Sequence, residues 1–315
     1  MTQSVLVTGA SGFVGRRLVA ALASAGNRVV AAARNPHAVR FPETVQIARL
    51  PDLAQRIDWE PLLADVAYVV HLAGVAHRGA DTTEEMYDRI NHQAVADLAM
   101  AAAKAGHVRV IFISSIGSQS GPSSEHVLSE ADEPRPTSAY GRSKLAAEIA
   151  LRGSAASYTI LRPVLMYGPE APGNMGMLVK LAASPWPLPF GALTGRRSLL
   201  AVDNLIGAVK LAMSSAATTE NETYVIADPD ALTLPEIVRV LRAAINRAPR
   251  LLPVPQGLLA NTLGMIGQGD LWQRLGASLV ADPAKLMTAG WRPAIDTRDG
   301  LTAMMRSGEP GSIRS

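Results

Sequence analysis

The sequence predicts an α/β protein with a doubly wound parallel sheet and a smaller C-terminal α/β domain. Short apolar runs alternate with helical patterns through the first half, as in proteins with parallel sheets. A glycine-rich loop joins the first apolar run to the first helical pattern. From Gly168 onward, repeated prolines mark loops in place of regular sheet. For 315 residues we expect a first domain at 1–168, with segments near 198–228 returning to it, and a second domain at 169–315.

The composition is that of a globular protein, because 48% of the residues are apolar and 18% are charged. The net charge of +3 is small, and Lys and Arg form no basic stripe with interleaved aromatics, so nucleic acid is not an expected partner. The absence of cysteine excludes disulfides, thiolate metal sites and cysteine nucleophiles. The six histidines lack metal-like spacing with acids, so no metal site is expected.

The start of the chain and its apolar runs argue against an exported or membrane protein. Residues 1–4 lead directly into a strand-like run, without the basic and long apolar regions of a signal peptide. No uninterrupted apolar stretch reaches the ~18 residues of a membrane span. We therefore expect a soluble, cytoplasmic protein without membrane insertion.

The first elements are a strand at 4–8, a glycine-rich loop, and a helix that continues through residue 25. Val14, Leu18 and Leu22 recur at four-residue spacing, and Gly26 stands where a helix commonly ends. Further strands are predicted at 28–33, 45–50, 66–72, 109–113 and 223–227. Further helices are predicted at 91–105, at 203–213, and from a capping box of Thr233 and Glu236 through residue 244.

The loop Gly9-Ala10-Ser11-Gly12-Phe13-Val14-Gly15 lies between a strand and a helix, which is the setting of a dinucleotide-binding loop. Glycines there permit a tight turn and a close approach of the backbone to the pyrophosphate, and the helix N-terminus adds free N–H donors. The spacing is Gly-x-x-Gly-x-x-Gly and not the commoner Gly-x-Gly-x-x-Gly, and an ordinary glycine turn is the alternative. The residues expected to bind the dinucleotide are Gly9, Ser11, Gly12, Phe13, Val14 and Gly15.

Residues at the ends of the next strands predict which dinucleotide binds. An NAD(H) site usually places an acid at the end of the second strand, whereas an arginine accommodates the 2′-phosphate of NADP(H). Here Ala33 is followed by Arg34, which favours NADP(H) over NAD(H), unless Arg34 simply faces solvent. Further expected contacts are Asp52 and Leu53 beside the adenine, and Leu72, Ala73 and Gly74 at a strand end where small residues allow close approach.

Tyr140 and Lys144 form a candidate acid–base pair, because residues four apart share one face of a helix. A neighbouring ammonium favours the phenolate and lowers the pKa of a tyrosine from its reference value of ~10. Tyr140 is then a general acid or base near neutral pH, although the same spacing also occurs on solvated helix faces. Ser115, just beyond the strand at 109–113, is the third candidate, and Ser114 is expected to point to the other side of that strand.

These motifs together resemble the extended short-chain dehydrogenase/reductase family. The interval from Ser115 to Tyr140, 140 − 115 = 25 residues, is similar to that between the catalytic residues of the family. Four further stretches resemble family motifs in the right order: HLAG at 71–74, LRPVLMYGP at 161–169, RRSLLAVDN at 196–204 and GWRP at 290–293. The resemblance implies a Rossmann-type fold, catalytic roles for Ser115, Tyr140 and Lys144, and cofactor contacts from Tyr140, Lys144, Asn91 and Pro163.

Within that family the chain most resembles the nucleotide-sugar branch, with its UDP-glucose 4-epimerase-like proteins and 4-keto-6-deoxy-sugar reductases. This narrower resemblance is carried by the stretches SSIGSQSG, AYGRSK, LPFGALTGRRSL and RLLPVPQGLL. Three positions depart from the pattern. Arg34 stands without the acid of an NAD-retaining epimerase, Ser120 replaces a tyrosine, and Asn204 replaces the second of two aspartates. The first two departures favour a reductase over an epimerase.

The resemblance implies an NADP(H)-dependent reductase acting on the 4-keto group of a UDP- or dTDP-linked 6-deoxyhexose, in the synthesis of surface-polysaccharide precursors. Tyr140 would donate the proton, Ser115 would hydrogen-bond the same oxygen, and Lys144 would bind the nicotinamide ribose. One alternative is a nucleotide-sugar 4-epimerase with tightly bound NAD. Another is a non-catalytic dinucleotide sensor or assembly subunit, which predicts degraded catalytic residues.

Asn174 and Arg197 are candidates to bind the diphosphate of a nucleotide-sugar substrate. A guanidinium suits this role because its fork of donors matches phosphate oxygens. Arg197 is preferred over Arg196 because its distance to Asp203, 203 − 197 = 6 residues, is that of the family motif. Asn174 can equally be a helix N-cap.

Two further expectations concern the oligomeric state of the protein and the role of one apolar stretch. The family implies a homodimer built from the helices that begin near Asn91 and Tyr140. The apolar stretch at 251–275 has three interpretations, namely a substrate lid, a dimer contact or plain core.

Overall fold

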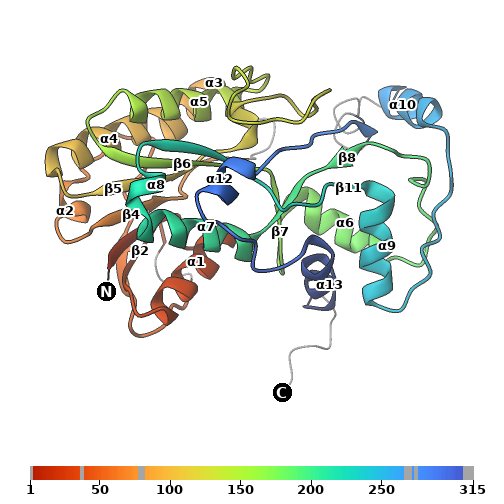
Figure 1. The fold of residues 1–315 in the computed structure, drawn as a ribbon, viewed down its shortest axis with the longest axis horizontal. Coiled ribbons are helices and arrows are strands. Elements are labelled where there is room, and N and C mark those ends of the chain that lie inside the picture. Colours follow the sequence, from red (N-terminus) through yellow and green to blue (C-terminus); the bar gives the residue numbers. More distant parts are fainter. Residues whose placement is uncertain (1–2, 36–38, 77–81, 266–271, 273–275, 308–315) are drawn as a thin grey trace.

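A seven-stranded sheet runs through the protein, and all of its neighbouring strands are parallel (Figure 1). The computed structural model describes residues 3–35, 39–76, 82–265, 272 and 276–307. From edge to edge the strands are β10 (Glu222–Ile226), β6 (Ser157–Pro163), β5 (Arg109–Ile113), β4 (Tyr68–His71), β1 (Ser4–Thr8), β2 (Arg28–Ala33) and β3 (Gln46–Arg49). The strand order changes direction between β1 and β4, where doubly wound sheets bind their ligands. The predicted doubly wound parallel sheet is confirmed.

The ends of the strands agree closely with the sequence pattern. Strands β1, β2 and β5 have the predicted ends, and β3, β4 and β10 differ from the predicted ranges by one or two residues. Strand β6 is the one member of the sheet for which the sequence analysis predicted no separate strand.

Helices cover both faces of the sheet, as parallel strands require. In Figure 1, α4 (Ala94–Ala105) and α5 (Ala139–Arg152) lie on one face, and α1 (Phe13–Ser24) and α7 (Val202–Ser214) lie on the other. The other described helices are α2 (Glu60–Leu63), α3 (Glu84–Tyr87), the π-helix η2 (Asp88–Gln93), the 3₁₀-helix η3 (Ile116–Ser118), α6 (Gly173–Ala183), α8 (Ala216–Thr219), α9 (Leu234–Ala244), α10 (Gln256–Met265), α12 (Ala284–Thr288) and α13 (Thr297–Ser307).

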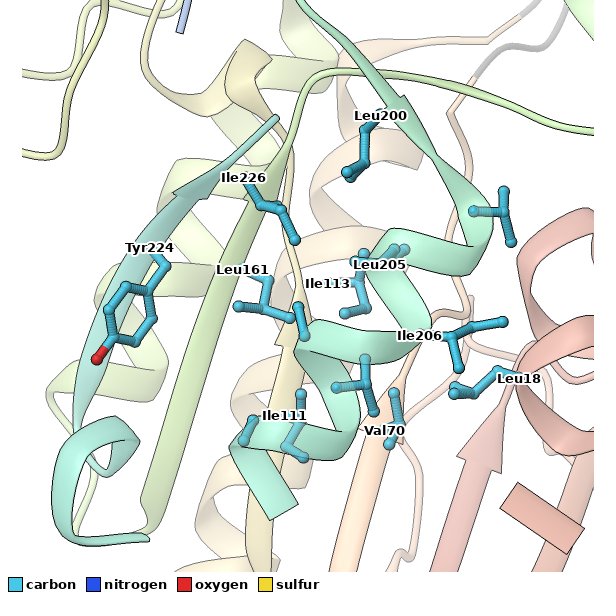
Figure 2. Close-up of a cluster of buried hydrophobic side chains, with 14 of the residues drawn as sticks. Leu18, Val70, Ile111, Ile113, Leu161, Leu200, Leu205, Ile206, Tyr224 and Ile226 are labelled. Atoms are coloured by element: carbon cyan, nitrogen blue, oxygen red, sulfur yellow. The ribbon is translucent and has the colours of Figure 1, made fainter. Parts of the chain in front are cut away.

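Each face of the sheet has its own apolar core, because successive side chains of a strand point to opposite faces. Val5 and Val7 of β1 belong to the core under α1 and α7, and Leu6 between them belongs to the core under α4 and α5. Figure 2 shows the first core, in which Leu205 of α7 lies against Ile113 of β5 and its neighbours. The second-half helix α7 therefore packs against the sheet formed by the first half.

The predicted helix at 91–105 has the correct end but the wrong start. Helix α3 is capped by Thr83, whose side chain accepts a hydrogen bond from the N–H of Met86 at 3.3 Å, and it continues into η2 and then α4. Asn91 therefore lies inside a π-helix, a form that is frequent at functional sites. The helix ends as predicted at Ala105, because Gly106 takes a left-handed conformation with φ of 72°.

The second half forms a smaller unit beside the carboxyl ends of the strands (Figure 1). It contains two short sheets, one pairing β7 (Leu165–Tyr167) with β9 (Leu199–Ala201), the other pairing β8 (Arg196–Arg197) with β11 (Leu232–Thr233). Helices α6, α9 and α13 contribute to its apolar core. The predicted capping box before α9 is confirmed, since Thr233 Oγ1 accepts from Glu236 N–H and the Glu236 carboxylate accepts from Thr233 N–H.

The apolar stretch at 251–275 is only partly described, because residues 266–271 and 273–275 lie outside the described ranges. Leu251 forms a β-bridge with Leu188 and packs against its core cluster, which fits the core interpretation at that end. In α10, Leu258 and Met265 are exposed, and for this helix the lid and dimer interpretations stay predictions.

Two absences can be reported for the described ranges of the chain. Among the helices described, none is both long enough and apolar enough to cross a bilayer. Over the same residues, no group of three or more His, Asp or Glu side chains is arranged to hold a metal ion.

Asn204 connects α7 to the C-terminal segment through a fully buried side-chain amide. Its Oδ1 accepts from the N–H groups of Ala294 (2.7 Å) and Ile295 (3.1 Å). Its Nδ2 donates to the carbonyl of Ile295 (2.8 Å) and to Asp228 Oδ1 (2.7 Å). Burial raises the pKa of Asp228 to about 6, partly opposed by hydrogen bonds from Asn204, Tyr167 and Ala201. An amide fits here because it supplies donors and an acceptor together.

Replacing Asn204 with Asp should therefore destabilise the fold, and more so at high pH. Asn204→Asp removes the donor to Asp228 and places two carboxylates in hydrogen-bond contact, which should cost about 2–4 kcal/mol of unfolding free energy at pH 8. Like charges raise the folded-state pKa of such a pair above the unfolded value, so the cost decreases as the pH falls through the raised pKa. Urea unfolding at pH 8 and pH 5 measures both effects.

Asn261→Asp is the matched control, since Asn261 is exposed within α10. It should change the unfolding free energy by less than about 0.5 kcal/mol at either pH. Equal effects of the two substitutions would contradict the role assigned to the Asn204 amide.

Candidate active site

The glycine loop is packed so tightly that Gly9 and Gly15 have no room for a side chain. Gly9 has φ of 69°, and a Cβ on it would lie 2.9 Å from the N of Ala73 and 3.0 Å from the carbonyl carbon of Leu72. A Cβ on Gly15 would lie 2.3 Å from the carbonyl oxygen of Gly9 and 2.8 Å from Ala10 Cα. The loop therefore lies directly against the end of β4, and α1 lies directly against the loop.

The N-terminus of α1 presents uncapped backbone donors. Its N-cap Gly12 offers no side chain, and the first turn of the helix contains no acidic residue. Ser11 and Gly12 are exposed, whereas Phe13 and Val14 are half-buried and Phe13 lies near Gly168. Free N–H groups at the positive end of a twelve-residue helix suit the pyrophosphate of a dinucleotide. The residues present thus fit the predicted cofactor.

Of the residues predicted to bind the adenosine half of the cofactor, only some have side chains open to a ligand. Arg34 is exposed just beyond the end of β2, where Ala33 is buried. Asp52 Oδ1 accepts from the N–H of Ala54 at 3.1 Å and so closes a local turn. Leu53 is buried in the core under α4 and α5. Arg34 and Asp52 therefore remain open to a ligand, and the side chain of Leu53 serves the core.

Ser115 and Tyr140 are brought together by the packing of two turns. Ser115 caps η3, where its Oγ accepts from the N–H of Gly117 at 3.0 Å. Ser138 caps α5 by accepting from the N–H of Gly141 at 3.0 Å, so Tyr140 lies in the first turn. A Cβ on Gly141 would lie 2.1 Å from the carbonyl oxygen of Gly117, which shows how closely the two turns approach. The Ser115 and Tyr140 side chains are hydrogen-bonded.

The pKa of Tyr140 is shifted in the direction opposite to the one predicted. Burial raises it to about 12, the hydrogen bond with Ser115 lowers it, and the neighbouring Tyr87 raises it. The expected lowering by Lys144 is wrong for this structure, because the cost of burying a phenolate is the largest effect. The phenol is therefore protonated at neutral pH and ready to donate a proton.

Lys144 is buried beside the ends of β4 and β5. Its Nζ donates to the carbonyl of Ile113 at 2.9 Å and lies 4.6 Å from the centre of the Phe112 ring. Burial lowers the pKa of Lys144 to about 8, and the charge of Glu148 partly opposes this. His71 is nearby, and burial followed by the charge of Lys144 lowers its pKa to about 3, so it is neutral above pH 5.

Asn91 connects the loop after β4 to α5. Its Oδ1 accepts from the N–H of Val75 at 2.8 Å, while its Nδ2 donates to the carbonyl of Val75 at 2.9 Å and to Ser143 Oγ at 3.1 Å. A Cβ on Gly74 would lie 2.7 Å from Asn91 Oδ1. Asn91 thus positions the backbone at the predicted cofactor edge, and Pro163 lies buried at the end of β6.

The predicted substrate residues lie outside the main sheet. Arg197 is half-buried in β8, and its Nη1 donates to the carbonyl of Pro122 at 3.1 Å, in the segment that follows Ser115. Arg196 is exposed and donates to the carbonyl of Ala231. Asn174 is exposed in the first turn of α6, where it is not the N-cap. Its N-cap interpretation is therefore wrong, and its binding role stays a prediction.

Two residues of this region were missed by the sequence analysis. The Tyr87 ring lies edge-to-face on Tyr140, with ring centres 6.1 Å apart, and Glu148 lies one turn beyond Lys144 on α5. Spacing could have indicated both. Tyr87 precedes Asn91 by four residues, and Glu148 follows Lys144 by four, so each pair shares a helix face.

The fold and site define a dinucleotide-binding enzyme of the short-chain dehydrogenase/reductase type. Residues 5–227 match the NAD dependent epimerase/dehydratase family, and the chain belongs to that family. The resemblance found in the sequence is confirmed.

Individual proteins agree with this assignment. The chain is 31% identical to a UDP-glucose 4-epimerase of Vibrio cholerae over 96% of its own length and 94% of that protein. It is 30% identical to N-acetyl-alpha-D-glucosaminyl-diphospho-ditrans,octacis-undecaprenol 4-epimerase of Escherichia coli O157:H7, over 85% and 78% of the two chains. Among solved structures, MoeE5 in complex with UDP-glucuronic acid and NAD is 26% identical, with a TM-score of 0.76 and coverage of 96% and 98%.

The tight contact at Gly15 predicts that a methyl group there will disturb cofactor binding. In Gly15→Ala, α1 must move away from the loop, which should cost about 1–3 kcal/mol of stability. The displaced N–H groups should weaken NADH binding by about tenfold or more. Fluorescence titration and thermal unfolding measure the two effects. Gly257→Ala is the control, because a Cβ there meets no atom within 4 Å, and equal behaviour of the two variants would contradict the argument.

Proposed function

We propose that this protein is a nucleotide-sugar 4-epimerase that uses NAD. The observation that carries the proposal is the hydrogen bond between Ser115 and Tyr140, with Lys144 one turn further along α5 and its Nζ at the end of β5. The names of two relatives support a 4-epimerase, and the NAD and UDP-sugar of the MoeE5 complex support the cofactor and the substrate class.

The proposed chemistry is reversible oxidation at C4 of the sugar. When bound against the free N–H groups at the start of α1, NAD would supply the hydride acceptor for C4 and the donor that reduces it again. As a phenolate, Tyr140 takes the proton of the C4 hydroxyl and returns it when the alcohol forms again. Ser115 donates a hydrogen bond to the same oxygen. Because Tyr140 is a phenol in this structure, it must first release that proton to water, and the positive charge of Lys144 would then stabilise the phenolate.

The substrate diphosphate is assigned to the second half of the chain. Arg197 is half-buried, and its contact with Pro122 connects β8 to the segment that follows Ser115. A bidentate guanidinium there and the exposed Asn174 at the start of α6 offer donors for phosphate oxygens. In this arrangement the sugar points toward Tyr140.

A second candidate is an NADP(H)-dependent reductase of a 4-keto sugar nucleotide, such as a UDP- or dTDP-linked 6-deoxyhexose. One observation favours it, because Arg34 is exposed at the end of β2 and Ala33 stands where an acid would bind the ribose of NAD. Its product would be a precursor for surface polysaccharide. Nothing in the relatives named above favours NADP(H) over NAD.

We also infer a homodimer formed through α4 and α5. Met100 on α4 and Ile149 on α5 are each 59% exposed, and these two helices are neighbours. A second copy of the same two helices would cover them.

Removing the phenol proton should stop the reaction. In Tyr140→Phe, turnover of UDP-glucose to UDP-galactose should fall by ~10²–10⁴-fold while the affinity for NADH is largely kept. Tyr158→Phe is the control, because Tyr158 pairs at the start of β6, at the opposite end of the sheet. Full activity of Tyr140→Phe would overturn the role assigned to Tyr140, and no activity in the unchanged protein would favour the non-catalytic alternative.

Cofactor content distinguishes the epimerase from the reductase. We expect denaturation of the purified protein to release NAD, and NADH to bind cofactor-stripped protein at least as tightly as NADPH. Arg34→Ala should then change NADH affinity no more than the exposed-surface control Arg247→Ala. Tighter binding of NADPH that is lost in Arg34→Ala would instead support the reductase.

A further inference from the structure

A buried carboxylate, Glu148, lies behind the candidate catalytic residues. It is fully buried on α5, one turn beyond Lys144. Arg162 of β6, itself buried, donates to both carboxylate oxygens, from Nη2 to Oε2 at 2.6 Å and from Nε to Oε1 at 3.0 Å. Arg152 adds a further contact, from Nη2 to Oε2 at 2.7 Å, on the more exposed side.

The same carboxylate holds the turn that contains Ser115. Ser114 Oγ donates to Glu148 Oε1 at 2.5 Å, whereas Ser115 is hydrogen-bonded to Tyr140. Ser118 Oγ lies 2.8 Å from Glu148 Oε1 and 2.8 Å from the carbonyl oxygen of Ser115. Two serines that flank Ser115 are therefore fixed to α5, the helix that carries Tyr140.

Arg162 extends this network to the loop beyond η3. Its Nη1 donates to Gln119 Oε1 at 2.9 Å. The Gln119 amide then donates to the carbonyl of Ser129. The ion pair thus connects β6, α5 and both ends of the Ser115 turn. An isolated buried ion pair adds little stability, because desolvation offsets the attraction. The contacts of this ion pair with Ser114, Ser118 and Gln119 therefore indicate a role in holding the Ser115 turn as well as in stability.

The charge of Glu148 also acts on Lys144. Burial alone would raise the pKa of Glu148, but the hydrogen bonds and charge of Arg162, with Ser114 and Ser118, lower it, so the carboxylate is ionised. Its negative charge opposes the loss of the Lys144 proton.

The other charged and titratable groups around Lys144 come from three elements. His71 on β4 is neutral, Tyr140 on α5 is a protonated phenol, and Arg162 on β6 is paired with Glu148. Glu148 is therefore the anion that helps to keep Lys144 charged.

We propose that Glu148 is a positioning residue for the reaction, which fixes Ser115 against Tyr140 through Ser114 and Ser118 and supplies the negative charge behind Lys144. This role rests on the proposed function of Ser115, Tyr140 and Lys144. Glu148 touches neither substrate nor cofactor in this account, and it acts through its neighbours.

Four variants separate the two parts of the role. Glu148→Gln keeps the length of the side chain but removes the charge, and Glu148→Asp keeps the charge but shortens the reach to the serines. Ser118→Ala breaks the link to the Ser115 carbonyl without touching the ion pair. Arg152→Gln is the matched control, because Arg152 contacts the same carboxylate but neither Ser114 nor Ser118.

The first measurement is independent of turnover. The chain contains five lysines, so a protein with ¹³C-labelled lysine gives a simple spectrum, and Lys144→Met identifies the Lys144 resonance. Its titration midpoint should lie near pH 8 in the unchanged protein. Glu148→Gln should lower the midpoint, because the anion is lost and Arg162 is left unpaired. Glu148→Asp, Ser118→Ala and Arg152→Gln should leave it nearly unchanged.

The second measurement is the kinetics of C4 epimerisation of UDP-glucose. Misplacing Ser115 should lower kcat by about ten- to hundredfold in Glu148→Asp and Ser118→Ala, with KM and NADH affinity within about twofold of the unchanged protein. In Glu148→Gln the pH profile should also shift its lysine limb to lower pH. Arg152→Gln should keep both kcat and the pH profile.

Specific results would overturn the proposal. Unchanged kcat in Glu148→Asp and Ser118→Ala, with only a lower melting temperature, would show that the network is merely structural. An unmoved Lys144 midpoint in Glu148→Gln would refute the charge effect. If Glu148→Gln does not fold, Ser118→Ala decides the positioning role. The double variant Glu148→Met with Arg162→Met, which removes the anion and leaves no unpaired buried charge, then decides the charge effect by whether the Lys144 midpoint falls. Failure of the proposed epimerase function appears separately, as a fully active Tyr140→Phe or no epimerase activity in the unchanged protein.

Discussion

Coverage of both faces of the parallel sheet is the constraint on which the rest of the structure depends. Parallel strands have no face for water, so the chain must supply helices on both sides. The face under α1 is completed by α7, which comes from the second half, and the edge strand β10 follows it (Figure 2). The second half therefore returns to the sheet after forming its own small sheets. That crossing places Arg197 close to the segment after Ser115.

Burial is also the dominant influence on the charges of the site. It raises the pKa of Tyr140 to about 12, lowers that of Lys144 to about 8, and lowers that of His71 to about 3. Each shift favours the neutral form, as expected when ionisable groups leave water. Glu148 is the exception, because Arg162 and two serines bind its charged form. The ionised pair thus lies behind a protonated phenol, Tyr140, and a lysine whose pKa stays near 8.

Two buried asparagines connect segments that are distant in sequence. Asn91 joins the loop after β4 to α5, and Asn204 joins α7 to residues 294–295. Each uses its amide oxygen as an acceptor and its amide nitrogen as a donor, which a carboxylate cannot do. The departure at Asn204 from the usual aspartate is thereby explained by packing beside Asp228, and it carries no information about the reaction.

The sequence by itself determined the alternation of strands and helices, the glycine loop and the family, because these depend on local periodicity and short motifs. It also predicted Tyr140, Lys144 and Ser115 as candidate catalytic residues. Only the tertiary structure decided the protonation of Tyr140 and the contacts of Glu148. Both depend on burial and on partners from other elements of the fold. The four-residue spacing of Tyr140, Lys144 and Glu148 along one helix gives no information on burial or on such partners.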